Sequence, residues 1–194
     1  VLKTKGEDYV IASDTDSIYL NMGPLVETVY KGREKTDESV VGFLNKVSEM
    51  ELEPYIQSSY EELAEYVSAY DQKMIMKREN IASSGIWTAK KRYMLNVWDS
   101  EGVRYNKPKL KMMGIEAVKS STPAPCRTAI KDAINIMMTG TEKDLLSFID
   151  RFKDEFNLLP PEDIAFPRSV NGLRKFKASG TVYTKGTPLH VRGT

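Results

Sequence analysis

Two aspartates separated by one residue, Asp14 and Asp16, form the pattern in this sequence that is best suited to metal chemistry. They lie in the polar segment 13–17, between the apolar runs 9–12 and 18–20, which predicts a β-hairpin with both carboxylates near its turn. Residues i and i+2 of a strand point to the same face, and neighbouring carboxylates repel unless a cation lies between them. Oxygen ligands without His or Cys suit Mg²⁺, Mn²⁺ or Ca²⁺, so we expect a divalent-metal site at this hairpin.

Other interpretations of the Asp-X-Asp pattern have to be weighed. Asp, Thr and Ser all favour turns, so a turn without any ligand explains the spacing equally well. An EF-hand loop starting at Asp14 is excluded, because its glycine position holds Tyr19 and its glutamate position holds Leu25. A sugar-nucleotide transferase also places Asp-X-Asp after an apolar strand, but it needs a nucleotide-binding α/β half before Asp14, where this chain has thirteen residues.

A second stretch whose residue types suit binding covers residues 86–98. It contains the consecutive cations Lys90, Lys91 and Arg92, followed by Tyr93. We expect this stretch to be one β-strand, with Lys91 as the single cation in an otherwise apolar row. Cations beside aromatic residues suit contact with a sugar-phosphate backbone, where they supply affinity and position without sequence preference.

Charge is segregated along the chain, although the net charge is only +1. Residues 1–72 carry 6 basic and 15 acidic side chains, whereas residues 73–121 carry 11 basic and 4 acidic ones. Residues 157–194 are again basic, with 6 cations and 2 anions. This asymmetry favours a polyanionic partner for the middle and the C-terminal part, although a solvated basic surface is a common alternative.

Length and composition indicate a globular chain of one or two small domains, since 41% of the 194 residues are hydrophobic. No apolar run is long enough to span a membrane. The single Cys126 excludes an internal disulfide, and a nucleophilic role for it is disfavoured because the only histidine, His190, is distant in the sequence. The chain does not begin with Met and ends in a strand-like run, so we expect it to be part of a longer protein.

Helical spacing of apolar residues predicts a long helix that begins at Thr36 or Asp37 and reaches about Tyr70. Pro54 should kink or restart this helix. Its opposite face is rich in glutamate, as expected of a solvated face, and its apolar face should cover one side of a sheet. The preceding segment, 22–35, is expected to be a connector.

Strands are predicted over residues 72–82 and 104–112, in addition to the one that carries the cations. Pro108 predicts that the last of these strands either lies at the edge of a sheet or ends at this proline. Glu79 is a third carboxylate that could reach the two aspartates from an adjacent strand, although a surface ion pair is the simpler interpretation. Three lysines alternate along the last strand: Lys107, Lys109 and Lys111. They either prevent the edge strand from pairing with another chain or face a polyanion.

The C-terminal part is predicted to contain two helices. Thr122 can cap the first helix, which Gly140 ends, and Thr141 can cap the second. The pair forms an αα-hairpin, and beyond Asn157 the helical pattern is lost. The patterns together predict an α+β fold, in which an antiparallel β part with packed helices precedes a mainly helical part.

Four motifs in this order resemble the family B DNA polymerases, and especially the replicative polymerases of T-even-type bacteriophages. The motifs are Asp-Thr-Asp-Ser-Ile-Tyr at 14–19, Lys-Lys-Arg-Tyr-Met-Leu-Asn-Val-Trp-Asp at 90–99, Lys-Ser-Ser-Thr-Pro at 119–123 and Pro-Leu-His-Val-Arg-Gly at 188–193. Each motif alone is weak, but four in the same order over the whole chain are specific.

The resemblance implies that residues 1–114 are the C-terminal part of a polymerase palm and residues 115–194 the first, incomplete part of a thumb. It implies template-directed nucleotidyl transfer with two Mg²⁺ ions, or Mn²⁺, on primer-template DNA and deoxynucleoside triphosphates. Further implied partners are the remaining polymerase segments (exonuclease, N-terminal palm, fingers and the rest of the thumb) and a sliding clamp. The implied location is the cytoplasm of an infected bacterial host.

The resemblance also implies roles for single residues. Asp16 would ligate the metal ions, Asp14 would shape the site beside it as a second candidate ligand, and Glu79 would lie close to the metals. Lys91 would contact the minor groove at the primer terminus. Contacts with the backbone of the duplex are implied for the other residues of the cationic stretch and for one further lysine: Lys90, Arg92, Tyr93 and Lys119.

Two departures from the family pattern qualify these expectations. Family members usually place Gly before the first aspartate, where this chain has Ser13, so a positive φ there would be strained. The family's other metal-ligating aspartate lies upstream of the residues present, so the isolated chain is expected to be inactive. A non-catalytic duplex-binding module is therefore the main alternative, and it would need Lys91 and Arg92 but not Asp16.

Overall fold

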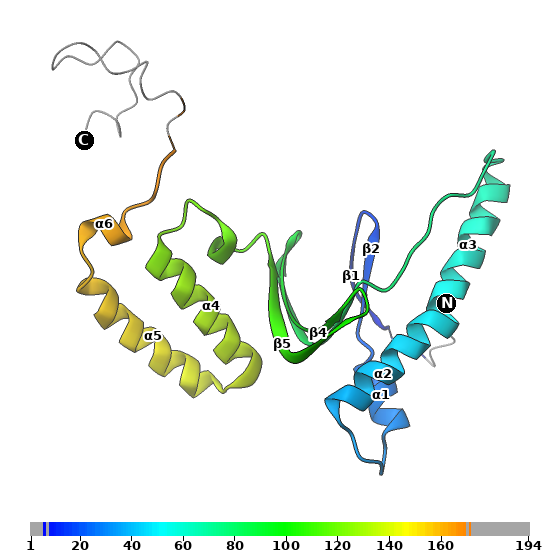
Figure 1. Ribbon diagram of the computed structural model, residues 1–194, viewed down its shortest axis with the longest axis horizontal. Helices are drawn as coiled ribbons and strands as arrows, with labels where there is room; N and C mark the ends of the chain where they lie inside the picture. The colour runs from blue at the N-terminus through cyan, green and yellow to red at the C-terminus, as the bar shows by residue number, and fades with distance from the viewer. Residues whose placement is uncertain (1–5, 7, 170, 172–194) are drawn as a thin grey trace. The chain divides into compact units, whose positions relative to one another are not determined.

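The computed structural model describes residue 6, residues 8–169 and residue 171. The chain divides into two compact units, Val1–Met113 and Gly114–Thr194 (Figure 1). Antiparallel strands with helices make up the described part of the first unit, and helices that of the second, so the predicted α+β class is confirmed. The motif at 188–193 lies outside the described residues.

The described strands of the first unit form two separate antiparallel sheets. Strands β1 (Val10–Asp14) and β2 (Ser17–Leu20) form the hairpin that the sequence predicts around the two aspartates. Strands β3 (Asn80–Ala89), β4 (Arg92–Ser100) and β5 (Val103–Met113) form a three-stranded sheet in that order. No ladder joins the two described sheets, so backbone pairing does not fix the position of the hairpin against the larger sheet.

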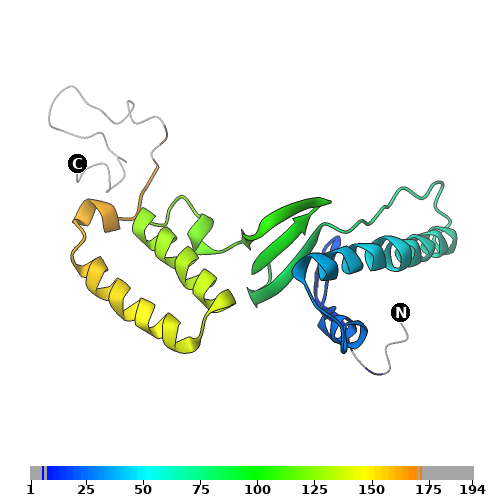
Figure 2. The same ribbon diagram turned by 60° about the horizontal axis from the view of Figure 1, so that its bottom comes forward.

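The helices of the first unit follow the hairpin. They are α1 (Gly23–Val29), α2 (Asp37–Val47) and α3 (Glu53–Tyr66), and a π-helical turn at Ser48–Leu52 joins the last two into one long rod (Figure 2). The predicted start of the long helix is confirmed, because Thr36 forms a capping box at the first turn of α2.

One expectation about these helices needs correction, and another is confirmed. Residues 22–35 are not only a connector, since they contain α1, whose first turn holds Pro24 and whose Val26 is buried. Pro54 lies in the first turn of α3, directly after the π-helical turn, so the predicted restart of the helix at this proline is confirmed. A proline has no N–H to donate to the preceding turn, which is consistent with the change from π-helical to α-helical bonding at this point.

The core of the first unit forms where α2 and the three-stranded sheet meet, rather than along the whole rod. Val41 of α2 is 3% exposed, whereas no residue of α3 is buried. The predicted covering role therefore applies to α2, which contacts β3. The buried apolar side chains of this unit are Val26, Val41, Ile81, Met94, Leu95 and Val97.

Two strand predictions are also wrong in their bounds. Residues 72–79 have no regular structure, and the strand predicted over 72–82 begins only at Asn80. The stretch 86–98 is not one strand, because the chain reverses between Ala89 and Arg92. The edge position of β5, which Pro108 predicts, is confirmed.

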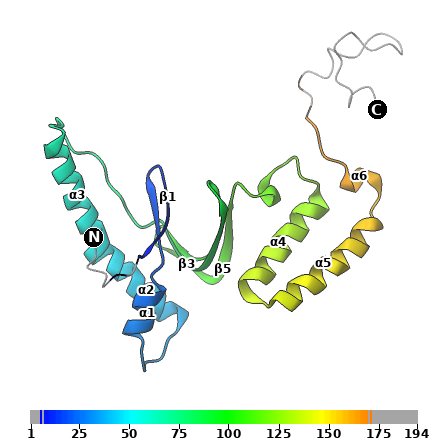
Figure 3. The ribbon, with the colours of Figure 1, turned by 180° about the vertical axis from the view of Figure 1, so that it is seen from behind.

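The second unit is helical in its described part. A short 3₁₀ helix (Glu116–Val118) precedes α4 (Ala124–Thr139), α5 (Glu142–Asn157) and α6 (Pro161–Ile164). Helices α4 and α5 lie side by side and antiparallel, as predicted (Figure 3). Within the described part of the chain, every helix is too short or too polar to cross a bilayer.

The predicted ends of α4 and α5 are confirmed at two of three positions. Gly140 ends α4, and Thr141 caps α5 in a capping box with Asp144. Thr122 does not cap α4, because the capping position is Pro123, whose side chain makes no hydrogen bond there. Thr122 is instead buried.

Candidate functional site

The two aspartates occupy different positions at the tip of the β1–β2 hairpin. Asp14 is the last residue of β1 and pairs with Ser17, so Thr15 and Asp16 form the turn. The turn's positive φ, 58°, falls on Thr15, and Ser13 is not among the described residues with positive φ. Asp16 is not in a strand, so the alternation that was expected to align it with Asp14 does not apply. The Ser-for-Gly departure therefore introduces no strain before Asp14.

The two carboxylates also differ in their surroundings. Asp14 Oδ1 accepts a hydrogen bond of 3.1 Å from the Thr15 hydroxyl and lies 4.0 Å from Lys91 Nζ. Asp16 is exposed and makes no hydrogen bond or ion pair with any described residue. Asp14 is thus held in place, while Asp16 has its oxygens available to a ligand.

Lys91 reaches Asp14 from the turn that joins β3 to β4. Ala89 pairs with Arg92, so Lys90 and Lys91 form a two-residue turn in which Lys91 has a φ of 62°. A left-handed conformation is uncommon for a residue with a Cβ atom and is kept only where surrounding structure fixes it. The turn brings the cationic motif to the acidic motif, seventy-seven residues earlier in the chain.

An aromatic cluster joins the two hairpins behind their tips. The ring of Tyr19, on β2, meets the rings of Trp87 and Tyr93 with centroid distances of 5.4 Å and 5.3 Å. Trp87 and Tyr93 are paired across β3 and β4 and stack at 6.2 Å. Edge-to-face and offset contacts of this kind stabilise beyond the area that they bury.

Tyr93 has a strongly perturbed phenol at the centre of this arrangement. Burial raises the pKa of Tyr93 above its ordinary value, as does its side-chain hydrogen bond with Tyr19. The negative charges of Glu79 and Asp14 raise the pKa of Tyr93 further. Both carboxylates therefore lie within electrostatic reach of one hydroxyl, and Tyr93 stays protonated at neutral pH.

Glu79 lies directly before β3 and contacts Lys111 of β5. Lys111 Nζ donates a short hydrogen bond to Glu79 Oε1, and this contact holds the pKa of Glu79 below its ordinary value. No contact joins Glu79 directly to Asp14 or Asp16 in the described residues. Glu79 and Asp14 thus both act electrostatically on Tyr93, but the charge of Glu79 is already compensated by Lys111.

The other predicted DNA contacts are placed in different surroundings. Lys90 is exposed and makes no ion pair with a described residue, whereas Arg92 begins β4 and is half-buried. Lys119 belongs to the second unit, where its Nζ lies 3.2 Å from Glu116 Oε1. Four of the five residues predicted to contact DNA therefore lie at the β3–β4 turn or directly after it: Lys90, Lys91, Arg92 and Tyr93.

A buried ion-pair network supports the other end of the sheet and was not predicted. The Asp99 side chain is 4% exposed and contacts Arg78 Nη1 at 2.6 Å and Arg104 Nε at 3.4 Å. Burial alone would raise the pKa of Asp99, but the Arg78 guanidinium, the Gly102 N–H and Arg104 together hold it below its ordinary value. This network fixes the start of β3 and the β4–β5 turn, and we assign it a structural role.

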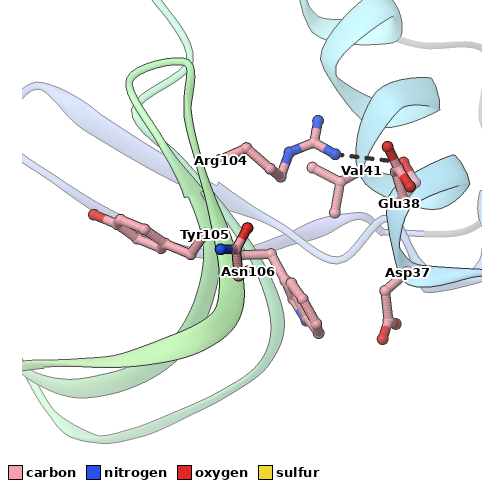
Figure 4. A pocket seen from close by; sticks show the side chains of 7 residues that line it. Asp37, Glu38, Val41, Arg104, Tyr105 and Asn106 are labelled. Atoms are coloured by element: carbon pink, nitrogen blue, oxygen red, sulfur yellow. Dashed lines mark hydrogen bonds between the residues drawn. The ribbon is translucent and has the colours of Figure 1, made fainter.

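A pocket of about 270 Å³ lies between α2 and the β4–β5 hairpin (Figure 4). Its polar lining includes Arg104, which points toward α2 and donates to the Glu38 carbonyl at 3.5 Å. None of the residues predicted to act in catalysis lines this pocket. The pocket and the hairpin-tip site therefore share no residue that is predicted to act in catalysis.

The donor set of the hairpin tip fits part of a magnesium site. Among residues 6, 8–169 and 171, no group of three or more His, Cys, Asp or Glu side chains could hold a metal ion. Two carboxylates are nevertheless a usual protein contribution to Mg²⁺, which takes its other oxygen ligands from water and substrate phosphates. Asp14 and Asp16 are the residues here that could serve in this way.

Sequence reasoning missed Lys111 as a neighbour of the site and Tyr19 as the link between the hairpins. Lys111 was visible only as one of three alternating lysines on an edge strand. Tyr19 was visible as the last residue of the Asp-Thr-Asp-Ser-Ile-Tyr motif, but no local pattern indicates which rings it meets. Both contacts depend on segments that are distant in the sequence.

Over its whole length the chain matches a segment of the DNA-directed DNA polymerases of T4-like bacteriophages, which confirms the resemblance inferred from the motifs. It is 38% identical to the DNA-directed DNA polymerase of Escherichia phage RB69 and 34% identical to that of Enterobacteria phage T4, each over 201 aligned positions. The chain spans 22% of the length of each of these relatives. No protein-family model matches the chain.

Proposed function

We propose that this chain supplies catalytic aspartates and a duplex-contacting turn to a phage DNA-directed DNA polymerase. The observation that carries the proposal is the approach of two hairpin tips, with Lys91 Nζ 4.0 Å from Asp14 Oδ1, in a chain that matches phage polymerases throughout. An acidic tip beside a cationic turn suits nucleotidyl transfer, in which carboxylates hold metal ions that contact the triphosphate and cations hold the nucleic-acid backbone.

In this proposal Asp16 is the principal metal ligand and Asp14 the second. The carboxylate of Asp16 is exposed and has no partner among the described residues, so it can coordinate a metal ion, whereas Asp14 is oriented by Thr15 and Lys91. When bound, two Mg²⁺ ions would stabilise the attacking 3′-oxygen and the leaving pyrophosphate, and Mn²⁺ could replace them. Glu79 lies in the surroundings of this site and shapes its charge together with Lys111.

The cationic turn would hold the primer-template duplex. Lys90 and Lys91 project from the β3–β4 turn, and the side chain of Lys91 is 68% exposed, so it can reach a partner while it remains near Asp14. Arg92, Tyr93 and, in the second unit, Lys119 complete the proposed set of contacts. Such contacts give salt-dependent affinity without sequence preference, as a replicative enzyme requires.

The two units correspond in this proposal to the C-terminal part of a palm, about 1–114, and the first part of a thumb, 115–194. Deoxynucleoside triphosphates and DNA are the substrates, and the other polymerase segments complete the enzyme. A sliding clamp is a further proposed partner, and the infected bacterial cytoplasm is the proposed location, by analogy with phage relatives.

The test is a chimeric phage RB69 polymerase in which this chain replaces the matching segment, assayed for Mg²⁺-dependent primer extension. Asp16→Asn should lower extension by about three orders of magnitude, the scale expected when a group that stabilises transition-state charge is lost. Asp71→Asn is the matched control, because Asp71 is a surface residue whose partner is Lys73 at 3.6 Å. Extension that survives Asp16→Asn would favour the non-catalytic duplex-binding alternative.

A further inference from the structure

The β1–β2 hairpin has no backbone attachment to the sheet that carries the cationic turn. The two sheets share no ladder, and a two-stranded hairpin is marginally stable on its own. Side chains that cross from one sheet to the other therefore contribute to the relative position of Asp14 and Lys91.

Tyr19 makes the described aromatic contacts that cross between the two sheets. Its ring meets Trp87 at an interplanar angle of 70° and Tyr93 at 59°, so it contacts both strands that flank the cationic turn. Its side chain also makes a hydrogen bond with Tyr93. Tyr19 is half-buried, as a packed ring with a polar end should be.

The backbone geometry around the cluster supports a fixed position for this ring. A Cβ atom added at Gly85 would lie 2.7 Å from Trp87 Cζ3, so the Trp87 indole lies directly over the Gly85 backbone. The indole thereby offers Tyr19 a rigid surface. Tyr93, in turn, is two residues from Lys91, so a shift of the Tyr19 ring would move the turn that reaches Asp14.

We propose that Tyr19 is a positioning residue that couples the acidic hairpin tip to the cationic turn, and so sets the distance between Asp14 and Lys91. Tyr19 does not itself touch the reacting groups. The inference rests on the proposed function for its catalytic meaning, but the coupling is a property of the chain that can be measured without any polymerase activity.

The experiment is zero-length cross-linking of the 194-residue chain with a water-soluble carbodiimide, followed by mass spectrometry of the peptides. The reagent adds to a carboxyl group to form an O-acylisourea. A nearby lysine amine then attacks the acyl carbon, forms an amide and releases the reagent as a urea. The Asp14–Lys91 product reports the distance between the tips. The Glu79–Lys111 product is the internal standard, because it forms within the same unit and does not involve the hairpin.

Tyr19→Phe keeps both ring contacts and loses one hydrogen bond, so the ratio of the Asp14–Lys91 product to the standard should fall by about threefold. Tyr19→Ala loses the ring contacts as well, and the ratio should fall by about tenfold or more. The matched control, Tyr105→Ala, removes a ring on β5 that contacts Lys109 and should leave the ratio unchanged.

An unchanged ratio in Tyr19→Ala would overturn the proposal, as would the absence of the Asp14–Lys91 product from the wild-type chain. A parallel loss of both products would also overturn it, because Tyr19 would then support the whole unit rather than the approach of the two tips. A reduced ratio together with full primer extension by Asp16→Asn would support the coupling and refute the proposed function, so the two failures are distinguishable.

Discussion

Lys91 Nζ lies 4.0 Å from Asp14 Oδ1, and each residue is at the tip of a different hairpin with a left-handed residue in its turn. The pair is loose and Lys91 is largely exposed, so this contact alone contributes little to stability. Its significance is positional, because it brings a cation to the carboxylate that stands beside the proposed metal ligand Asp16.

Removal of the Lys91 charge should weaken duplex binding in a salt-dependent way. In the Lys91→Ala variant of the chimeric polymerase, the slope of log affinity against log salt concentration should decrease by about 1, since one phosphate-neutralising cation is lost. Lys73→Ala is the control, because Lys73 is an exposed lysine paired with Asp71. The measurement is fluorescence anisotropy with labelled primer-template at several salt concentrations, and an identical slope would contradict the contact.

Gly85→Ala should disturb the aromatic cluster without touching a charged group. The new methyl group would lie 2.7 Å from both Leu95 Cδ2 and Trp87 Cζ3, and the rigid indole has to shift to accept it. We expect a destabilisation of about 1–3 kcal/mol, as for other overpacked positions. Urea denaturation of the chain would measure it, with Gly42→Ala as the control, which should not destabilise because a Cβ atom there meets nothing within 4 Å and alanine is the better helix former in α2.

Asp99→Asn should destabilise the chain strongly, because it leaves two guanidinium groups without their buried carboxylate. The expected loss is about 3 kcal/mol, and Asp71→Asn should change stability by less than about 0.5 kcal/mol. The folded-state pKa of Asp99 is lowered, so its stabilisation is present above its usual value near 3.8 and is lost as the pH falls through the lowered pKa. A constant difference between wild type and Asp99→Asn from about pH 7 to about pH 2 would contradict this assignment.

Lys111→Met should release Glu79 from its ion pair and raise the pKa of Glu79 toward the usual value near 4.5. Because the pKa of Glu79 is lowered in the folded chain, the ion pair stabilises the fold at pH values above the usual pKa of a glutamate. This stabilisation is lost as the pH falls through the lowered, folded-state pKa. The pair is partly exposed, so the loss at neutral pH should be about 0.2–1 kcal/mol.

Denaturation midpoints at about pH 7 and about pH 3 would measure this effect, with Lys107→Met as the control. Lys111→Arg should restore most of the difference. A Lys111→Met chain as stable as wild type at neutral pH would show that the contact with Glu79 has no energetic role.

Local signals in the sequence were sufficient to predict the elements that depend on neighbouring residues. The β1–β2 hairpin follows from two apolar strands around a polar turn. The starts of α2 and α5 follow from the capping threonines Thr36 and Thr141. In each case the hydrogen bonds that define the element lie within a few residues of one another.

The cationic turn could not be predicted, because Lys90 and Lys91 are not turn-forming residues. Lys91 adopts a φ of 62° without being Gly or Asn, a conformation that tertiary contacts must stabilise. The same holds for the Glu79–Lys111 contact, which joins residues 32 positions apart. The sequence therefore predicts the residue types at the two hairpin tips, Asp14 and Asp16 among them, but not how the tips are arranged, and their assignment to a metal site stays a prediction.

The most direct test of the central claim is single-turnover incorporation of one nucleotide by the chimeric polymerase, with duplex affinity measured in parallel. Asp16→Asn should slow incorporation by about three orders of magnitude at saturating DNA and leave duplex affinity within about twofold of wild type. An Asp16→Asn enzyme that incorporates nucleotide at the wild-type rate would contradict the assignment of this hairpin tip to catalysis.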